Sequence, residues 1–250
     1  MPEGPSIFIL KESLYQFKGK QIISISGNSK IDQHRLLNKH VLDFRSWGKH
    51  LLICFDDFTV KFHLLMFGSY TINDEKDRAP RLLITFPNGY VNFYSCSVTI
   101  LEGYVDTLYD FSSDVMDDSW DEVKALDKLK QLPNTMICDA LLEQDIFAGV
   151  GNIIKNETLF RVKVHPESTV GNIPISLQQG IITEARNYSF DFLKWRRKFE
   201  LKKHYLIYNQ KLCHTCNGPI TRKNTGIKNR RSFFCPNCQQ KYYSQLIVPT

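Results

Sequence analysis

Apolar residues near the start of the chain recur at steps of three and four positions. They are Ile7, Leu10, Leu14 and Phe17. This spacing places the four side chains on one face of a helix that would begin near Pro5 and stop before Gly19. The pattern therefore predicts a short amphipathic helix directly after Pro2 and Glu3.

From residue 20 to about residue 101 the pattern changes to short runs rich in β-branched and aromatic residues. Six runs predict strands, at 20–26, 41–47, 50–55, 59–65, 81–86 and 90–95. Pro87-Asn88-Gly89 predicts a hairpin turn between the last two strands. Many short strands after one helix indicate a β-sandwich or a flattened barrel.

Residues 103–130 show weak periodicity and a strong acidic bias. Nine acidic residues lie from Glu102 to Asp127, against the single Lys124. We expect this segment to be a partly helical connection between two domains, which 250 residues with 42% apolar content can support.

Beyond this connection, the spacing predicts a helix at 136–142 and a second helix that ends near Phe160. The segment between them, from Phe147 to Asn152, contains two glycines just before a helix start. Such a start brings backbone amides and the positive end of a helix dipole close to an anion. An ordinary helix hairpin has the same pattern, so both interpretations stay open.

A long helix is predicted from Ser176, where Gln179 would complete a capping box. Apolar residues follow one face of it, at positions 177, 181, 185, 188, 192, 195 and 199. A stripe of this kind indicates contact with a core rather than with a cofactor.

Four of the seven cysteines form two Cys-x-x-Cys pairs separated by eighteen residues. The pairs are Cys213 with Cys216 and Cys235 with Cys238. This spacing is typical of a closed, structural site for one Zn²⁺ ion, because four thiolates leave no position for water. The other three cysteines lie singly in apolar surroundings, which favours buried thiols in a reducing compartment over a disulfide framework.

Positive charge gathers in the last quarter of the chain. Residues 186–241 contain fourteen Lys or Arg against only Asp191 and Glu200. Five of these cations, and no acid, lie between the cysteine pairs: Arg222, Lys223, Lys228, Arg230 and Arg231. The metal would thus hold a basic hairpin, and a polyanion is the expected partner. A basic face that only confers solubility is the alternative.

No apolar stretch is long enough to span a bilayer, and the first residues lack a basic leader followed by an apolar run. We therefore expect no membrane partner and an intracellular location, in the cytoplasm or at the nucleoid.

The sequence Met1-Pro2-Glu3 carries the first candidate chemistry. Removal of Met1 would leave a secondary amine at Pro2, which condenses with a sugar aldehyde carbon to a cationic iminium ion. The positive end of the following helix would favour an ionised Glu3 and a neutral amine. A structural alternative is that Pro2 is merely a small second residue that permits Met1 removal.

Four separated segments resemble one family of base-excision repair enzymes, the formamidopyrimidine-DNA glycosylase and endonuclease VIII family. They are Pro2-Glu3-Gly4-Pro5, the stretch from Leu141 to Asn152, the stretch from Phe160 to Pro166, and the cysteine hairpin with Arg230 five residues before Cys235. The resemblance covers nearly the whole chain.

The resemblance implies an α+β fold: an N-terminal helix with a β-sandwich domain, then a helical domain with a helix-two-turn-helix and a zinc-finger β-hairpin. It predicts a catalytic domain at 1–112, an acidic linker at 113–131, a helix-two-turn-helix domain at 132–208 and a zinc-finger hairpin at 209–250.

The resemblance also implies a bifunctional DNA glycosylase and lyase that acts as a monomer on damaged double-stranded DNA. Pro2 would attack C1′ of the damaged nucleotide and Glu3 would protonate the sugar ring oxygen. The resulting Schiff base would drive β- and δ-elimination. Lys49 matches a strand lysine that holds phosphate near the lesion and completes the predicted catalytic group, although a solvated strand lysine is its structural alternative.

Further positions are implied to bind DNA. Asn152 and Arg230 match residues that hold the phosphates beside the flipped nucleotide. His63 matches a histidine near the DNA backbone, and a core or sheet histidine is the alternative. Three residues match the loop that fills the gap left by an extruded base: Leu65, Met66 and Phe67. For at least one of the three we expect burial in the core instead.

Two departures from the family pattern bear on substrate. Ser6 stands where most members carry a second glutamate, which leaves a catalytically weak damaged-DNA binding protein as a rival. Residues 93–97 lack the Arg-x-Phe loop and look like the endonuclease VIII branch, which favours oxidised pyrimidines. The context of Met66 points to oxidised purines, so both remain open. A third reading is an RNA-binding zinc ribbon.

Overall fold

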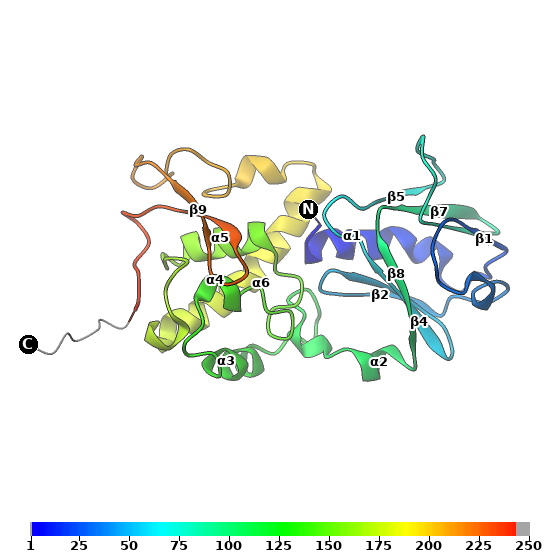
Figure 1. Ribbon diagram of the computed structural model, residues 1–250, viewed down its shortest axis with the longest axis horizontal. Helices are drawn as coiled ribbons and strands as arrows, with labels where there is room; N and C mark the ends of the chain where they lie inside the picture. Colours follow the sequence, from blue (N-terminus) through cyan, green and yellow to red (C-terminus); the bar gives the residue numbers. More distant parts are fainter. Residues whose placement is uncertain (1, 244–250) are drawn as a thin grey trace, which may run out of the picture. The chain divides into compact units, whose positions relative to one another are not determined.

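The computed structural model describes residues 2–243, which form two compact units that divide between Asp110 and Phe111 (Figure 1). The finer division of the chain into four parts stays a prediction. Within residues 2–243, none of the helices combines the length and the apolar composition of a membrane span.

The first unit begins with the predicted amphipathic helix. Helix α1 (Gly4–Leu14) follows Glu3, which is its N-cap residue, and continues into the 3₁₀ turn η1 (Tyr15–Phe17). The four residues of the apolar stripe, Ile7, Leu10, Leu14 and Phe17, are all buried in one core. The prediction of this helix is confirmed, and the core anchors the segment that carries Pro2.

Two four-stranded antiparallel sheets complete the first unit. One has the order β2-β3-β4-β8 and the other the order β1-β6-β7-β5. The first sheet contains β2 (Asp43–Trp47), β3 (His50–Cys54), β4 (Phe58–His63) and β8 (Ser97–Glu102). The second contains β1 (Ser24–Ser26), β5 (Ser69–Ile72), β6 (Leu82–Phe86) and β7 (Gly89–Tyr94). Phe62 of one sheet stacks on Phe93 of the other, with ring centroids 4.1 Å apart. The predicted β-sandwich is confirmed.

Strands β5 and β8 were not expected from the sequence, and the predicted strand at 20–26 is reduced to Ser24–Ser26. No residue of β5 or β8 is fully buried, so neither has the alternation of buried and exposed positions that marks a strand. They are strands because β7 and β4 supply antiparallel hydrogen-bonding partners.

The acidic segment falls in both units. Helix α2 (Val105–Leu108) belongs to the first unit, whereas η3 (Phe111–Ser113) and α3 (Glu122–Lys130) belong to the second. The side chain of Asp121 caps α3 by accepting hydrogen bonds from the backbone N–H groups of Val123 and Lys124. Part of the acidic bias therefore serves local helix capping.

The second unit is built around helices α5 (Asn152–Arg161) and α6 (Ile175–Arg197), which pack against each other. The remaining elements are short: α4 (Ile137–Ala140), η4 (Val170–Asn172), η5 (Leu201–His204), β9 (Thr221–Thr225) and β10 (Arg230–Phe234). Strands β9 and β10 form an antiparallel hairpin. The predicted helical domain with a β-hairpin is confirmed.

Two details predicted for the long helix are wrong. Pro174 is its N-cap residue and makes no side-chain capping bond, so Ser176 and Gln179 form no capping box. At the other end, Phe199 lies beyond the last helical residue and is 93% exposed rather than buried. The helix ends at Arg197, so the seventh position of the stripe never reaches the core.

Candidate active site and nucleic-acid interface

Pro2 and Glu3 lie together at the N-terminus of α1. Pro2 is half-buried, and Glu3 is fully buried despite its charged side chain. The carbonyl oxygen of Glu3 accepts a hydrogen bond from the backbone N–H of Ser6 (2.8 Å), which begins the helix. The structure thus places a buried carboxylate beside Pro2, at the helix end where negative charge is most stable.

Lys49 occupies the two-residue turn between β2 and β3. Trp47 pairs with His50 across this turn, and Gly48 has the left-handed conformation (φ 54°) that such a turn requires. Burial, followed by the positive charge of Lys49, lowers the pKa of His63 on β4. The structure therefore brings Lys49 and His63 close enough to interact.

An aromatic group supports this turn and was missed in the sequence. The ring of His50 lies 5.4 Å from that of His63 and 5.9 Å from that of Tyr109. Burial, then the charges of His63, Lys61 and Lys49, lowers the pKa of His50 to about 4, so this side chain is neutral at physiological pH. Tyr109 is separated from His50 by 59 residues, which no local pattern can connect.

The loop between β4 and β5 presents three consecutive apolar side chains to solvent. Leu65 and Met66 are about half exposed (51% and 50%), and Phe67 is 82% exposed. The expectation that at least one of them is buried in the core is wrong. Leu64, one residue earlier, is buried instead and accepts a hydrogen bond from the N–H of Gly68 (2.7 Å), which closes the loop.

In the second unit, Asn152 is the first residue of α5. It is buried, and its side-chain oxygen has no hydrogen-bond partner among residues 2–243. The turn before it is shaped by Gln144, whose side chain accepts from the N–H of Gly149 (3.2 Å) and donates to the carbonyl of Val150 (3.3 Å). A buried side-chain oxygen without a hydrogen-bond partner lowers the stability of the folded protein.

Arg230 begins strand β10, where it pairs with Thr225 of β9. The turn of the hairpin is held by the buried carboxylate of Asp139. Its two oxygens accept hydrogen bonds from the N–H groups of Ile227 (2.8 Å) and Lys228 (3.1 Å). A carboxylate from α4 therefore fixes the position of the hairpin turn.

Helix α5 holds the second strand of the hairpin through buried polar side chains. Lys155 donates to the hydroxyl of Ser232 (3.0 Å), and the side-chain oxygen of Asn156 accepts from the N–H of Phe233 (2.8 Å). The amide nitrogen of Asn156 also donates to the carbonyls of Asn152 (2.7 Å) and Arg231 (3.3 Å). One side chain thus links the segment of Asn152 to the segment of Arg230.

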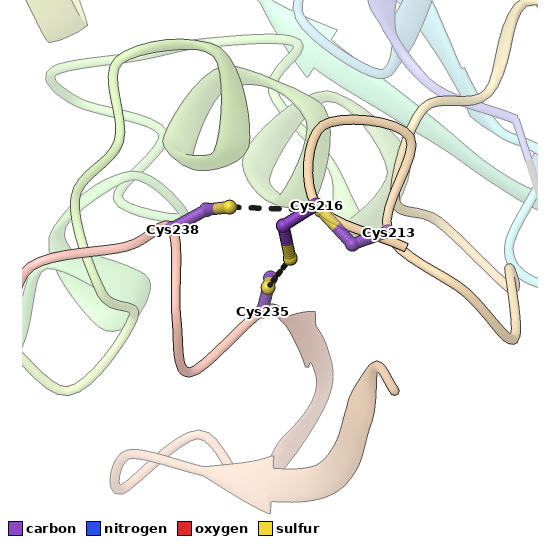
Figure 2. A group of neighbouring side chains, drawn as sticks. All are labelled: Cys213, Cys216, Cys235 and Cys238. Atoms are coloured by element: carbon purple, nitrogen blue, oxygen red, sulfur yellow. Dashed lines mark hydrogen bonds between the residues drawn. The ribbon is translucent and has the colours of Figure 1, made fainter. Parts of the chain in front are cut away.

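The four predicted metal ligands lie together at the base of the hairpin (Figure 2). All their sulfur atoms lie within 4.8 Å of one another, with Cys216 and Cys235 3.5 Å apart and Cys213 and Cys238 3.8 Å apart. Tetrahedral coordination with Zn–S bonds of about 2.3 Å would separate the sulfurs by about 3.8 Å. The four thiols could therefore hold a metal ion.

The surroundings of Cys213 favour a thiolate, and a side-chain amide fixes the position of Cys235. Burial acts to raise the pKa of Cys213, but hydrogen bonds from the backbone N–H groups of Cys216 and Thr215 lower it to about 7. The side chain of Gln239 accepts from the N–H of Cys235 (2.9 Å) and donates to the carbonyl of Val164 (2.8 Å). This amide links the metal-binding loop to the segment that follows α5.

The structure thus groups the predicted site residues within each unit. The first unit carries Pro2, Glu3, Lys49, His63 and the loop at 64–68. The second carries Asn152, Arg230 and the four cysteines. Asp139, Lys155 and Asn156, which hold the hairpin, were not found from the sequence. What distinguishes these three residues is that they are polar and buried, and their burial is known only from the folded structure.

Two family models match the chain. The formamidopyrimidine-DNA glycosylase N-terminal domain matches residues 1–96, and the formamidopyrimidine-DNA glycosylase H2TH domain matches residues 113–187. Among curated proteins, Endonuclease 8-like 3 of Bos taurus is 30% identical over 224 residues, which is 86% of this chain and 37% of that protein. Endonuclease 8-like L720 of Acanthamoeba polyphaga mimivirus is 25% identical, over 96% of this chain and 100% of that protein. The chain spans somewhat over a third of the length of the Endonuclease 8-like 3 proteins that it matches.

Solved structures show the same fold. A viral DNA glycosylase superposes with a TM-score of 0.83 at 22% identity and covers 95% of this chain and 100% of its own. The Lactococcus lactis formamidopyrimidine-DNA glycosylase bound to DNA with an AP site has a TM-score of 0.83 at 23% identity, over 96% of this chain and 100% of its own.

Proposed function

The chain belongs to the formamidopyrimidine-DNA glycosylase and endonuclease VIII family, and from this premise we propose that it is a bifunctional DNA glycosylase and lyase. Its substrates would be oxidised bases in DNA. The observation that carries this proposal is the pairing of Pro2 with the buried carboxylate of Glu3 at the start of α1. A carboxylate beside a nucleophilic amine can take up and deliver protons during the reaction.

In this mechanism, removal of Met1 leaves the secondary amine of Pro2. Its nitrogen forms a bond to C1′ and gives its proton to the carboxylate of Glu3, which passes it to the ring oxygen as that oxygen gives up its bond to C1′. The damaged base then leaves and takes a proton from water, while the nitrogen lone pair completes an iminium ion with C1′. Loss of a proton from C2′ then expels the 3′ phosphate, and a second elimination expels the 5′ phosphate. Water releases Pro2 from the remaining aldehyde.

The other predicted residues would position the DNA. Lys49 and His63 would contact phosphate near the lesion, and Asn152 and Arg230 would hold the phosphates beside the extruded nucleotide. The exposed loop residues Leu65, Met66 and Phe67 would fill the gap in the base stack. Their exposure supports this role, because a gap-filling side chain must be available on the surface before DNA binds.

We further propose that the four cysteines hold one structural Zn²⁺ ion. The sulfur separations fit tetrahedral coordination, and four thiolates leave no position for a water molecule. When bound, the ion would supply folding energy to the hairpin that carries Arg230 and no chemistry on the DNA.

Oxidised pyrimidines are the favoured substrates. Phe93 and Tyr94 end strand β7 and are buried, and no arginine follows them at the position of the missing Arg-x-Phe loop. Oxidised purines are the second candidate, on the context of Met66. A damaged-DNA binding protein with weak catalysis is a third, on the presence of Ser6.

Borohydride trapping tests the mechanism. The protein, with removal of Met1 verified by intact mass, is incubated with labelled duplexes that contain an abasic site, thymine glycol or 8-oxoguanine, and then reduced. We expect a covalent complex that disappears in Pro2→Thr, with yields that rank the substrates. No adduct on any duplex, despite bound zinc and tight DNA binding, would support the non-catalytic alternative.

A further inference from the structure

Phe199 is the most exposed large apolar residue in residues 2–243, at 93%. It also has a left-handed backbone conformation, with φ 58°. The N–H of Phe199 bonds to the carbonyl of Arg196 (3.1 Å), and the N–H of Glu200 bonds to that of Trp195 (2.9 Å). This geometry ends helix α6 at a position where glycine is the preferred residue.

Phe199 therefore combines two unfavourable features. A bulky side chain in the left-handed region strains the backbone, and an apolar ring in water gains nothing from the hydrophobic effect. Neither feature is needed to end the helix, because glycine at this position would end α6 without a strained backbone and without an exposed ring. A role outside the folded chain explains why phenylalanine stands there.

The surroundings of Phe199 are strongly basic. Four exposed cations within five residues of it have no acidic partner among residues 2–243: Lys194, Arg196, Lys198 and Lys202. Lys203 is the exception, because it pairs with Glu200 (3.2 Å). Cations at the end of α6 also complement the helix dipole, but Lys202 lies beyond the helix, in η5.

The other two aromatic rings of this region stack on each other. Trp195 is stacked on His204, with ring centroids 4.2 Å apart and planes at 7°. Tyr188 meets the ring of Trp195 edge-on at 5.9 Å, and the guanidinium of Arg161 lies 5.8 Å from the centre of that ring. Phe199 is thus the most exposed ring in residues 194–204.

We propose that residues 194–204, named here the basic-aromatic patch, bind an unpaired DNA strand. Phe199 would stack on one base, and the four cations would contact the neighbouring phosphates. Stacking needs a base face that no neighbour covers, which an intact duplex does not offer. A lipid surface fits less well, because it requires several adjacent apolar side chains and the patch presents one. This inference rests on the proposed function only in taking DNA as the polymer.

The test exploits opposite expected effects on stability and on binding. Phe199→Gly removes the backbone strain and the exposed ring, so its unfolding midpoint should be equal to or above that of the wild type. Its affinity for a fluorescein-labelled oligo(dT), measured by anisotropy, should fall about 5- to 100-fold, as loss of one stacked base predicts. Phe199→Trp should restore binding, and Phe190→Ala, a partly exposed residue elsewhere on α6, should leave it unchanged.

The charge part of the patch has its own measurement. Lys202→Gln should lower the slope of log affinity against log salt by about 0.7 for single-stranded DNA. Unchanged oligo(dT) affinity in Phe199→Gly would overturn the proposal, as would binding of wild-type protein to anionic vesicles that is lost in this variant while oligo(dT) binding persists. Failure of the glycosylase proposal looks different: Pro2→Thr should keep oligo(dT) binding, and Phe199→Gly should keep trapping on an abasic duplex.

Discussion

The loop at 64–68 and the β9–β10 hairpin are both proposed to contact DNA, yet they are held in opposite ways. The loop closes through one backbone hydrogen bond and turns Leu65, Met66 and Phe67 to solvent. The hairpin is fixed by buried side chains from α4 and α5 and by the cysteine group. The two segments therefore differ in what surrounds and holds them.

The difference follows from what each segment would do. A side chain that fills a gap in a base stack must leave water when DNA arrives, so it cannot also be part of a core. A side chain that holds a phosphate needs a constant position, and buried charged hydrogen bonds provide it. Changes in the loop should therefore affect DNA alone, whereas changes in the hairpin anchors should affect both folding and DNA.

Loss of the metal should have the largest effect. Cys235→Ala removes one of four ligands, and structural zinc sites in finger peptides contribute about 10–16 kcal/mol of apparent binding energy. We expect metal content, measured by mass spectrometry, to fall and duplex affinity to drop by at least tenfold. His214→Ala is the control, since His214 neighbours Cys213 but is not among the four ligands. Full DNA affinity in a metal-free protein would contradict the role of the hairpin.

The anchor at the hairpin turn comes next. Gly226 has φ 69°, and a Cβ added there would collide with the carboxylate of Asp139. Gly226→Ala should lower the free energy of unfolding by about 1–3 kcal/mol and weaken DNA binding. Chemical denaturation measures the first effect and fluorescence anisotropy the second.

Gly180→Ala is the matched control for Gly226→Ala. Gly180 lies within α6, and a Cβ there meets no atom within 4 Å. Gly180→Ala should leave DNA binding unchanged and stabilise the fold by roughly 0.5–1 kcal/mol. If both alanine variants behaved alike, the Asp139 anchor would have no special importance.

A change in the loop at 64–68 should affect the reaction on DNA but not the stability of the fold. Phe67→Ala removes a side chain that is 82% exposed, so the free energy of unfolding should change by no more than about 0.5 kcal/mol. Trapping on a lesion duplex should fall roughly tenfold or more, because the gap left by the extruded base stays unfilled. Destabilisation without loss of trapping would show that the loop belongs to the core after all.

The smallest expected effect is a pH dependence of stability that arises from His50, which follows Lys49 in the chain. Burial lowers the pKa of His50 to about 4, from an ordinary value near 6.5. Between these values the unfolded chain binds a proton that the folded chain does not, so stability should fall as the pH drops below about 6.5. The contribution of His50 to this loss between pH 7 and pH 5.5 should be about 1 kcal/mol.

His50→Phe keeps an aromatic ring and removes the titrating group. Denaturation at pH 7 and pH 5.5 should show a smaller decrease for this variant than for the wild type. The remaining decrease has two further sources. Burial lowers the pKa of His63 beside His50 and, in the second unit, lowers the pKa of His165 to about 4. Equal decreases in both proteins would place the pH dependence outside the neighbourhood of Lys49.

Local spacing predicted much of this molecule. The steps of three and four in α1, the alternation in the central strands and the two Cys-x-x-Cys pairs each depend on residues a few positions apart, and each prediction is confirmed in place or spacing. Strands β5 and β8 were missed because their partners, rather than their own residues, make them strands. Phe199 was placed in the core because a periodic pattern does not show where a helix stops.

The order of residues therefore predicted most of the elements, the grouping of the four cysteines and the family. Contacts across long stretches of chain decided the rest. Asp139 lies 88 residues from the N–H of Ile227 that it holds, and His50 lies 59 residues from Tyr109. Burial, exposure and pKa values depend on which distant side chains fill the space around a group, and only the folded chain brings these together.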